Sequence, residues 1–120
     1  MFNNIKECLL ALKGLDGFIG ACLADSETGL VLGQIGNSLN MEVAAAANSE
    51  VVRAKRKTLR ILRLEDEIED IFITLGTQYH LIRPLKSEPK FFFYLVLDRF
   101  QGTLALSRFA LADVERKLSL

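Results

Sequence analysis

The sequence has few of the residues from which metal centres and active sites are built. Its 120 residues contain no tryptophan, two cysteines, two prolines and one histidine. Cys8 and Cys22 lack the spacing of a metal or redox motif, so we expect reduced thiols rather than a disulfide. Any His-based metal site or Ser–His or Cys–His pair would depend on His80 alone, which favours a solvated or hydrogen-bonded strand histidine. The sequence therefore predicts no catalytic residue, no metal site and no cofactor.

An excess of charge of one sign and a long apolar run are also missing. The 15 basic and 15 acidic residues balance, so nothing global attracts the chain to nucleic acid or to a membrane. The longest apolar run, Phe91–Leu97, is far shorter than the ~18 residues that span a bilayer. The amino-terminal residues do not have the pattern of a secretion signal. We expect a cytoplasmic protein without membrane insertion.

Loops that bind phosphate or calcium are not evident either. Gly14, Gly17 and Gly20 have the wrong spacing for a nucleotide loop and lead into a strand rather than a helix. No GxxxxGK[ST] motif is present, so the chain is not itself a P-loop GTPase. The acidic residues of 65–70 lack the glycine and spacing of a calcium loop, which favours a solvated sheet edge. The turn at 25–27 has the same interpretation.

The residues that are present centre on one strongly apolar segment, Lys90–Asp98. Large apolar side chains alternate to both sides of this segment, so it predicts a central strand with both of its faces covered. Apolar periodicity predicts the other elements. We expect helices over 2–12, 40–62 and 102–118, and strands over 17–25, 30–35, 71–75 and 79–83. The order predicts one domain over residues 1–120, a three-layer α/β/α fold with a five-stranded, mostly antiparallel sheet.

The long helix leads to the prediction of a homodimer. If the first and last helices cover one face of the sheet, the long helix must cover the other face alone. A single helix about 10 Å across is too narrow for a five-stranded sheet about 24 Å wide. The alanine-rich segment 44–47 suits another helix packed closely against it. A second copy of the chain satisfies both conditions.

Three segments, ACLADSETGLVLG, AAAANSEV and YLVLDRFQGTLALSRFALADVERKL, together with the element order, resemble the Roadblock/LC7 family, whose fold is profilin-like. The last segment matches the family's Asn-Leu-Ala-Leu-Ala-Arg helix opening, with Thr103 where asparagine is usual. The segment 25–32 matches the Asp-x-x-Gly-Leu hairpin, with a turn one residue longer than in many members. The similarity extends over essentially the whole chain.

The resemblance implies a non-catalytic role as a regulator or scaffold of a small Ras-like GTPase, or as a light chain. It also implies dimerisation through the long helix and the adjacent edge strand. The expected dimer contacts are Met41, Ala44, Ala45, Asn48, Val52 and Phe72.

Two further surfaces are candidates for contact with a partner. Arg53, Arg56, Lys57 and Arg60 form a basic helix face that either is solvated or binds a partner through paired charges. Phe109 lies opposite the apolar side of the last helix, and is a second candidate if it proves exposed, although core packing is slightly favoured. One functional alternative is a dimeric scaffold or light chain that binds the GTP-loaded and the GDP-loaded partner alike. A less favoured alternative is a sensor that binds an apolar small molecule on the open face of the sheet.

Overall fold

The computed structural model describes residues 2–119 and contains the predicted elements in the predicted order. These are α1 (Ile5–Leu12), β1 (Phe18–Asp25), β2 (Val31–Ile35), α2 (Met41–Ile61), β3 (Ile71–Thr74), β4 (Gln78–Pro84), β5 (Phe91–Asp98) and α3 (Leu104–Lys117). The predicted fold class is confirmed. None of the helices within residues 2–119 is long and apolar enough to cross a membrane.

The sheet places β5 at its centre, as its two apolar faces predict. The strand order is β2-β1-β5-β4-β3, and every neighbouring pair is antiparallel. In the middle of the sheet Tyr94 of β5 lies between Cys22 of β1 and Ile82 of β4. β3 is an edge strand, as the acidic segment before it predicts. Its outer backbone groups have no strand partner among the described residues.

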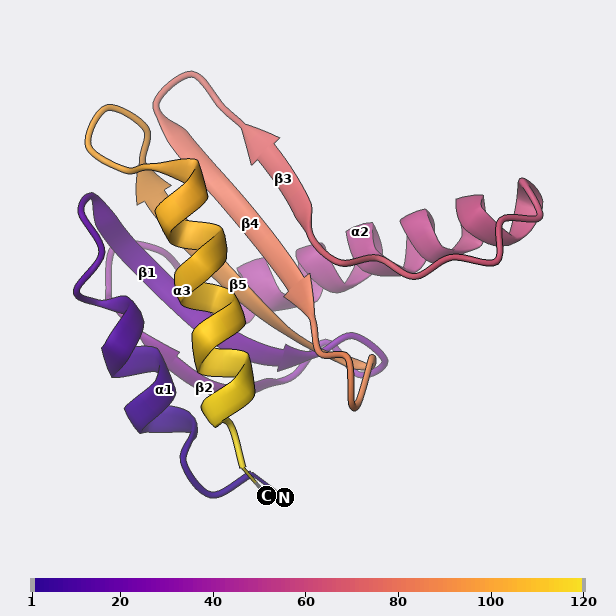
Figure 1. The fold of residues 1–120 in the computed structure, drawn as a ribbon, viewed down its shortest axis with the longest axis horizontal. Coiled ribbons are helices and arrows are strands. Elements are labelled where there is room, and N and C mark those ends of the chain that lie inside the picture. The colour runs from indigo at the N-terminus through magenta and orange to yellow at the C-terminus, as the bar shows by residue number, and fades with distance from the viewer. Residues whose placement is uncertain (1, 120) are drawn as a thin grey trace.

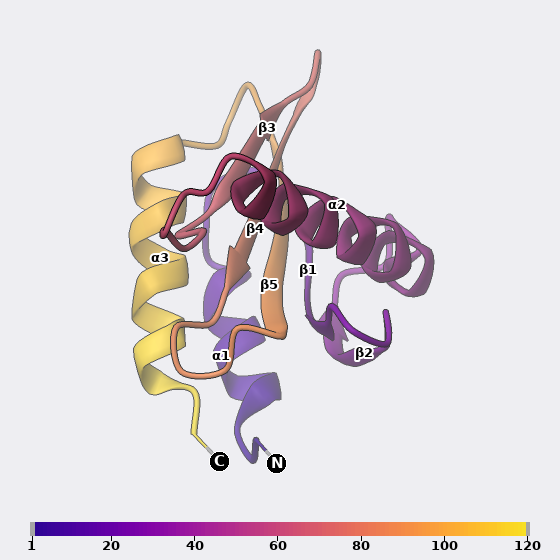
Figure 2. The ribbon, with the colours of Figure 1, turned by 90° about the vertical axis from the view of Figure 1, so that its right-hand side faces the viewer.

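Helices cover the two faces unequally. α1 and α3 lie on one face, and α2 crosses the other face alone (Figures 1 and 2). The first core includes Leu9, Phe93 and Leu111, whereas the second includes Met41 and Phe92. α2 packs mainly over β1 and β2, and Ile82 of β4 and Ile71 of β3 also belong to this second core, so the helix covers the β4–β3 part of its face less completely. The predicted distribution of the helices is confirmed.

Local chemistry explains several element boundaries. The Asn40 side chain accepts a hydrogen bond from the Val43 amide at 3.2 Å and caps α2, as expected. Gly29 adopts a φ of 77° in the β1–β2 turn, a conformation that costs glycine little. α1 begins at Ile5 rather than at the expected residue 2, because Phe2 instead packs edge-on against Phe91, with ring centroids 5.2 Å apart.

The carboxyl-terminal part of α2 extends away from the sheet. The buried residues of this 21-residue helix are Met41, Ala45, Ser49 and Val52, and none follows Val52. Figure 1 shows the helix continuing beyond the β3 edge before the chain returns to β3. We call residues 53–64 the α2 arm. At its end lie Ile61, Leu62 and Leu64, which are 69%, 59% and 52% exposed.

Candidate protein interface

Three of the six expected dimer contacts are buried in the chain's own core. Met41, Ala45 and Val52 are 1%, 0% and 0% exposed and pack on the second core of the same chain. The helical period correctly identified an apolar face of α2. That face packs on the sheet beneath it, where the small residues Cys22 and Ala24 leave room. It has no surface to offer a second copy.

The other expected contacts remain accessible. Ala44 and Asn48 are half-buried on one flank of α2, next to Val51, which is 37% exposed. Phe72 lies on the edge strand but faces the α1/α3 side, where its ring centroid is 5.2 Å from that of Tyr79. We call Ala44, Asn48 and Val51 the α2 flank.

A hydrogen-bonded network lies on the α2 side of β4 and β5. The Tyr94 hydroxyl is 2.9 Å from His80 Nδ1, and His80 Nε2 is 2.8 Å from Gln78 Oε1. Burial lowers the pKa of His80 and raises the pKa of Tyr94, with a hydrogen bond from Asn48 opposing the second shift. His80 is half-buried, and its cross-strand neighbours are Ile73 of β3 and Val96 of β5. The expected hydrogen-bonded strand histidine is confirmed.

The basic face of α2 contains two side chains that bind loops of the same chain and two that do not. A guanidinium nitrogen of Arg53 donates to the Ser26 carbonyl oxygen, and one of Arg56 donates to the Pro89 carbonyl oxygen. These bonds attach α2 to the β1–β2 turn and to the β4–β5 loop. Burial lowers the pKa of Arg56. Arg53 is exposed despite its bond, and Lys57 and Arg60 are exposed and form no ion pair within residues 2–119, so Lys57 and Arg60 are the two members of the predicted strip without a partner in the described chain.

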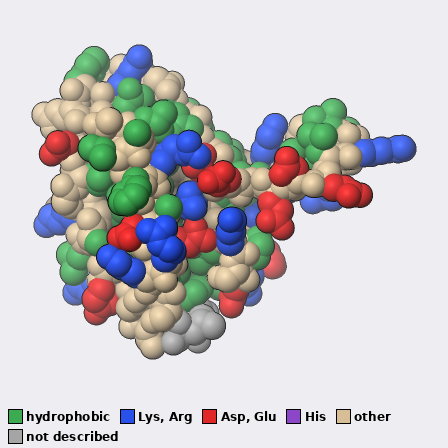
Figure 3. Space-filling view, viewed as in Figure 1, with side chains coloured by type: hydrophobic (Ala, Val, Ile, Leu, Met, Phe, Trp, Pro, Cys, Tyr) green, Lys and Arg blue, Asp and Glu red, His purple; other side chains and the backbone are tan. Residues whose placement is uncertain are grey.

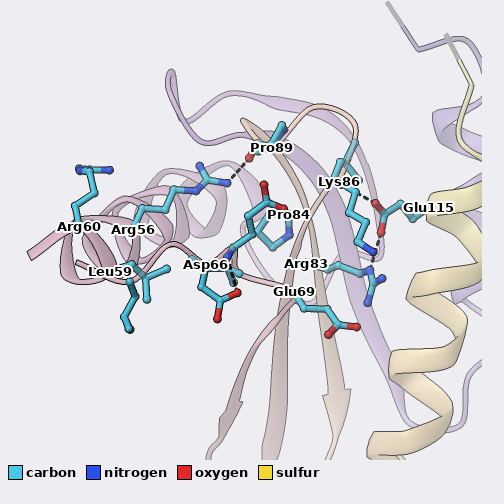
Figure 4. A pocket seen from close by; sticks show the side chains of 14 residues that line it. Arg56, Leu59, Arg60, Asp66, Glu69, Arg83, Pro84, Lys86, Pro89 and Glu115 are labelled. Atoms are coloured by element: carbon cyan, nitrogen blue, oxygen red, sulfur yellow. Dashed lines mark hydrogen bonds and ion pairs between the residues drawn. The ribbon is translucent and has the colours of Figure 1, made fainter. Parts of the chain in front are cut away.

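A pocket of about 460 Å³ lies between the α2 arm, the segment that returns to β3, and the end of β4 (Figure 4). Its most buried charged residue is Arg83, whose Nε donates to Glu115 Oε1 at 2.7 Å. Glu115 Oε2 also accepts from the Lys86 amide at 2.8 Å. The lining combines cations of α2, Arg56 and Arg60, with carboxylates of the return segment, including Asp66. This charged lining differs from the apolar site on the open sheet face that a sensor was expected to use.

A further apolar surface lies on α3 and its preceding loop. Phe109 is 69% exposed, so the expectation that it packs in the core was wrong. Phe100 and Leu106 are also exposed. Figure 3 shows hydrophobic side chains grouped on this side of the molecule, with charged groups beside them. The Asp98 carboxylate accepts from the Phe100 amide at 2.8 Å and holds the loop in place.

A five-stranded antiparallel sheet with one long helix on one face and two helices on the other is the fold of Roadblock/LC7 domains. No family model matches the sequence, and no curated protein matches it. Solved structures do match the fold. A Roadblock/LC7 domain from Streptomyces avermitilis superposes with a TM-score of 0.84 at 14% identity, over 96% of this chain and 94% of that chain.

Two gliding-related structures are also similar. MglB from Myxococcus xanthus has a TM-score of 0.80 at 13% identity, over 96% of this chain and 94% of that chain. The gliding protein MglB from Thermus thermophilus has a TM-score of 0.72 at 16% identity, over 95% of this chain and 90% of that chain. At these identities the similarity establishes the fold.

Proposed function

We propose that the chain forms a two-fold homodimer in the cytoplasm and acts as a non-catalytic regulator or adaptor that binds a small Ras-like GTPase. The class of function rests on the Roadblock/LC7 fold and on the sequence segments that resemble that family. The dimer rests on the structure of this chain. The single observation that supports it best is the α2 arm, which carries exposed apolar side chains beyond the edge of its own sheet.

The length of α2 explains why a second copy fits there. A helix of 21 residues is about 31 Å long, whereas the outer strands of a five-stranded sheet are about 19 Å apart. The arm extends past β3, the edge with unpaired backbone groups. If β3 of a second copy pairs with this edge, the partner's sheet lies beneath the arm. Ile61 and Leu62 then cover the half-buried Ile73 and His80 of the other copy.

The proposed interface therefore differs in part from the expected one. It retains Ala44 and Asn48 of the α2 flank, adds Val51, and retains Phe72 through the β3 edge rather than through α2. Both copies use the same surfaces, as a two-fold contact requires. A solved MglB structure with a tetrameric arrangement, similar to this chain with a TM-score of 0.73, supports self-association as a property this fold can have.

Lys57 and Arg60 are the proposed contacts to the GTPase. Both are exposed, and they extend from the basic side of the arm into solvent. Cations in such a position accelerate association with an acidic surface and pair with its carboxylates. Arg53 and Arg56 instead position the loops on which the arm rests.

A binding experiment with a small GTPase encoded beside this chain's gene tests the proposal. We expect the dimer to distinguish the GTP-loaded from the GDP-loaded form, and Lys57→Glu combined with Arg60→Glu to weaken binding at least tenfold with the dimer mass unchanged. The matched control, Lys6→Glu with Lys13→Glu, reverses two exposed charges on and next to α1. Equal binding of both nucleotide forms would instead support a scaffold, and no binding of either form would contradict the proposed partner.

A further inference from the structure

The arginine side chains divide into those that bind another part of the chain and those that do not. The sequence contains eight arginines, and all of them lie within residues 2–119. Six donate a hydrogen bond from the guanidinium group to another residue: Arg53, Arg56, Arg83, Arg99, Arg108 and Arg116. The other two, Arg60 and Arg63, form neither a side-chain hydrogen bond nor an ion pair within these residues. Both lie at the end of the α2 arm.

Arg63 also has an unusual backbone conformation. Its φ is 56°, and within residues 2–119 it is the one residue other than glycine with a positive φ. In this left-handed region the Cβ atom of an L-residue lies close to the following carbonyl oxygen, a contact that glycine avoids. Glycine is accordingly the usual residue at this position after a helix. The arginine at position 63 therefore lowers the stability of the fold relative to glycine.

The turn that ends α2 imposes this conformation. The Arg63 amide donates to the Arg60 carbonyl oxygen at 3.1 Å, and the Leu64 amide donates to the Leu59 carbonyl oxygen at 2.9 Å. This pair of bonds is the Schellman motif, which reverses the chain after a helix. Leu59 and Leu64, which the motif brings together, both line the pocket described above. Residue 63 must be left-handed whichever side chain it carries, so the turn does not explain the choice of arginine.

The helix dipole does not explain the arginine either. A cation near the carboxyl end of a helix interacts favourably with the dipole, and Arg60 already occupies the last turn of α2. Arg63 is exposed, so solvent screens any further interaction of this kind. The gain from a second cation at such a site is smaller than the penalty of the left-handed conformation for a residue with a Cβ atom. Stability alone therefore favours glycine at position 63.

The charges at the end of the arm indicate what these guanidinium groups can bind. Lys57 precedes Arg60 by three residues, so the two cations are neighbours on the helix surface. Glu65 and Asp66 follow directly and are exposed, and their carboxylates repel an extended polyanion such as nucleic acid or an anionic membrane. A guanidinium group pairs with a single carboxylate through two parallel hydrogen bonds. The end of the arm therefore fits a protein surface that presents a few separate carboxylates.

We propose that Arg63 is a binding residue, and that Arg60 and Arg63 pair with two carboxylates on the surface of the small GTPase; this step rests on the proposed function. The Schellman turn fixes the backbone of Arg63 beside that of Arg60 before the partner arrives, so less conformational freedom is lost on binding. Binding thus accounts for an arginine that the fold alone does not favour. Stability and binding favour different residues at position 63, as at other strained functional positions.

Three substitutions separate the backbone conformation from the charge. Arg63→Gly removes both the strain and the charge, Arg63→Gln removes only the charge, and Arg63→Lys keeps the charge but not the two parallel donors. We expect Arg63→Gly to raise the midpoint of thermal unfolding by about 3 °C, and Arg63→Gln to change it by about 1 °C or less. A midpoint lowered by Arg63→Gly would show that the arginine stabilises the fold, and would overturn the inference. A sedimentation mass altered by these variants would place Arg63 in self-association instead, and would overturn it as well.

Titration calorimetry with the small GTPase encoded beside this chain's gene gives the second measurement. We expect Arg63→Gly and Arg63→Gln to weaken binding equally, at least tenfold, and Arg63→Lys to weaken it less. The matched control, Arg116→Gln, removes an exposed arginine from the last turn of α3, on the other face of the sheet, and should leave binding unchanged. Equal binding by the original chain and by Arg63→Gly overturns this inference alone. If the original chain binds neither nucleotide form of the GTPase, the proposed function fails and this inference fails with it.

Discussion

Ile61→Ser is the most direct test of the proposed dimer. Ile61 is 69% exposed at the end of the α2 arm, so its replacement does not remove a core contact of the single chain. Complete burial of such a side chain stabilises by about 2 kcal/mol, so covering the exposed fraction in a dimer contributes about 1.4 kcal/mol per copy. A two-fold interface contains the residue twice, and the total loss is about 3 kcal/mol. Because each 1.4 kcal/mol is tenfold, we expect the dissociation constant to rise about 100-fold.

Sedimentation equilibrium over a dilution series measures this constant directly. Leu10→Ser is the matched control, because Leu10 is 47% exposed on α1, on the face away from the arm. We expect the control to dimerise like the original chain. Circular dichroism of both variants checks that α2 is intact. An unchanged dissociation constant for Ile61→Ser would refute the assignment of the arm to the interface. A loss of helical signal in the circular dichroism of Ile61→Ser would show instead that Ile61 stabilises α2 within the single chain.

Two further predictions concern the single chain. Gly36 has a φ of 92°, and an added Cβ would lie 2.6 Å from the Ile19 carbonyl oxygen. Gly36→Ala should therefore lower the free energy of unfolding in urea by about 3 kcal/mol. The control, Gly76→Ala, would add a Cβ with no neighbour within 4 Å and should leave this free energy almost unchanged. A cost below about 1 kcal/mol at Gly36 would contradict this reasoning. Because the pKa of His80 is lowered in the folded chain, the unfolded chain binds the proton more readily. The free energy of unfolding should therefore fall as the pH decreases below about 6.5. His80→Gln should remove this part of the dependence of the unfolding free energy on pH. A slope identical in both proteins would show that His80 is not responsible.

Sequence periodicity predicted the elements because burial on a strand or helix repeats with the backbone. β5 is the clearest example: alternating rings at Phe92 and Phe93 require cover on both faces, and both are fully buried. The same periodicity could not say which surface covers a helix face. Ala45 is as suitable for a helix of a second copy as for the small residues of its own β1, and the structure places it on the sheet.

The basic strip shows a second limit of the sequence. Arg53 and Arg56 are three residues apart on one side of α2, a pattern shared by solvated and partner-binding faces. Their roles depend on Ser26 and Pro89, which lie 27 and 33 residues away along the chain. Only the folded chain brings those carbonyl oxygens to the guanidinium groups. Helix periodicity likewise did not single out Ile61, because Lys57 and Arg60 make the end of α2 resemble a solvated segment.

The division of α2 into two halves connects the fold to the proposed function. Its first half packs on the sheet within one chain, whereas its second half touches its own chain only through loops, with Arg53 bound to Ser26 and Arg56 to Pro89. An isolated helix as short as residues 53–64 is only marginally stable in water. The helical structure of the arm therefore depends on its continuity with the packed half of α2 and on contacts that cover Ile61 and Leu62. In the proposed dimer, a second copy covers these side chains with the exposed part of its own β3–β4 face.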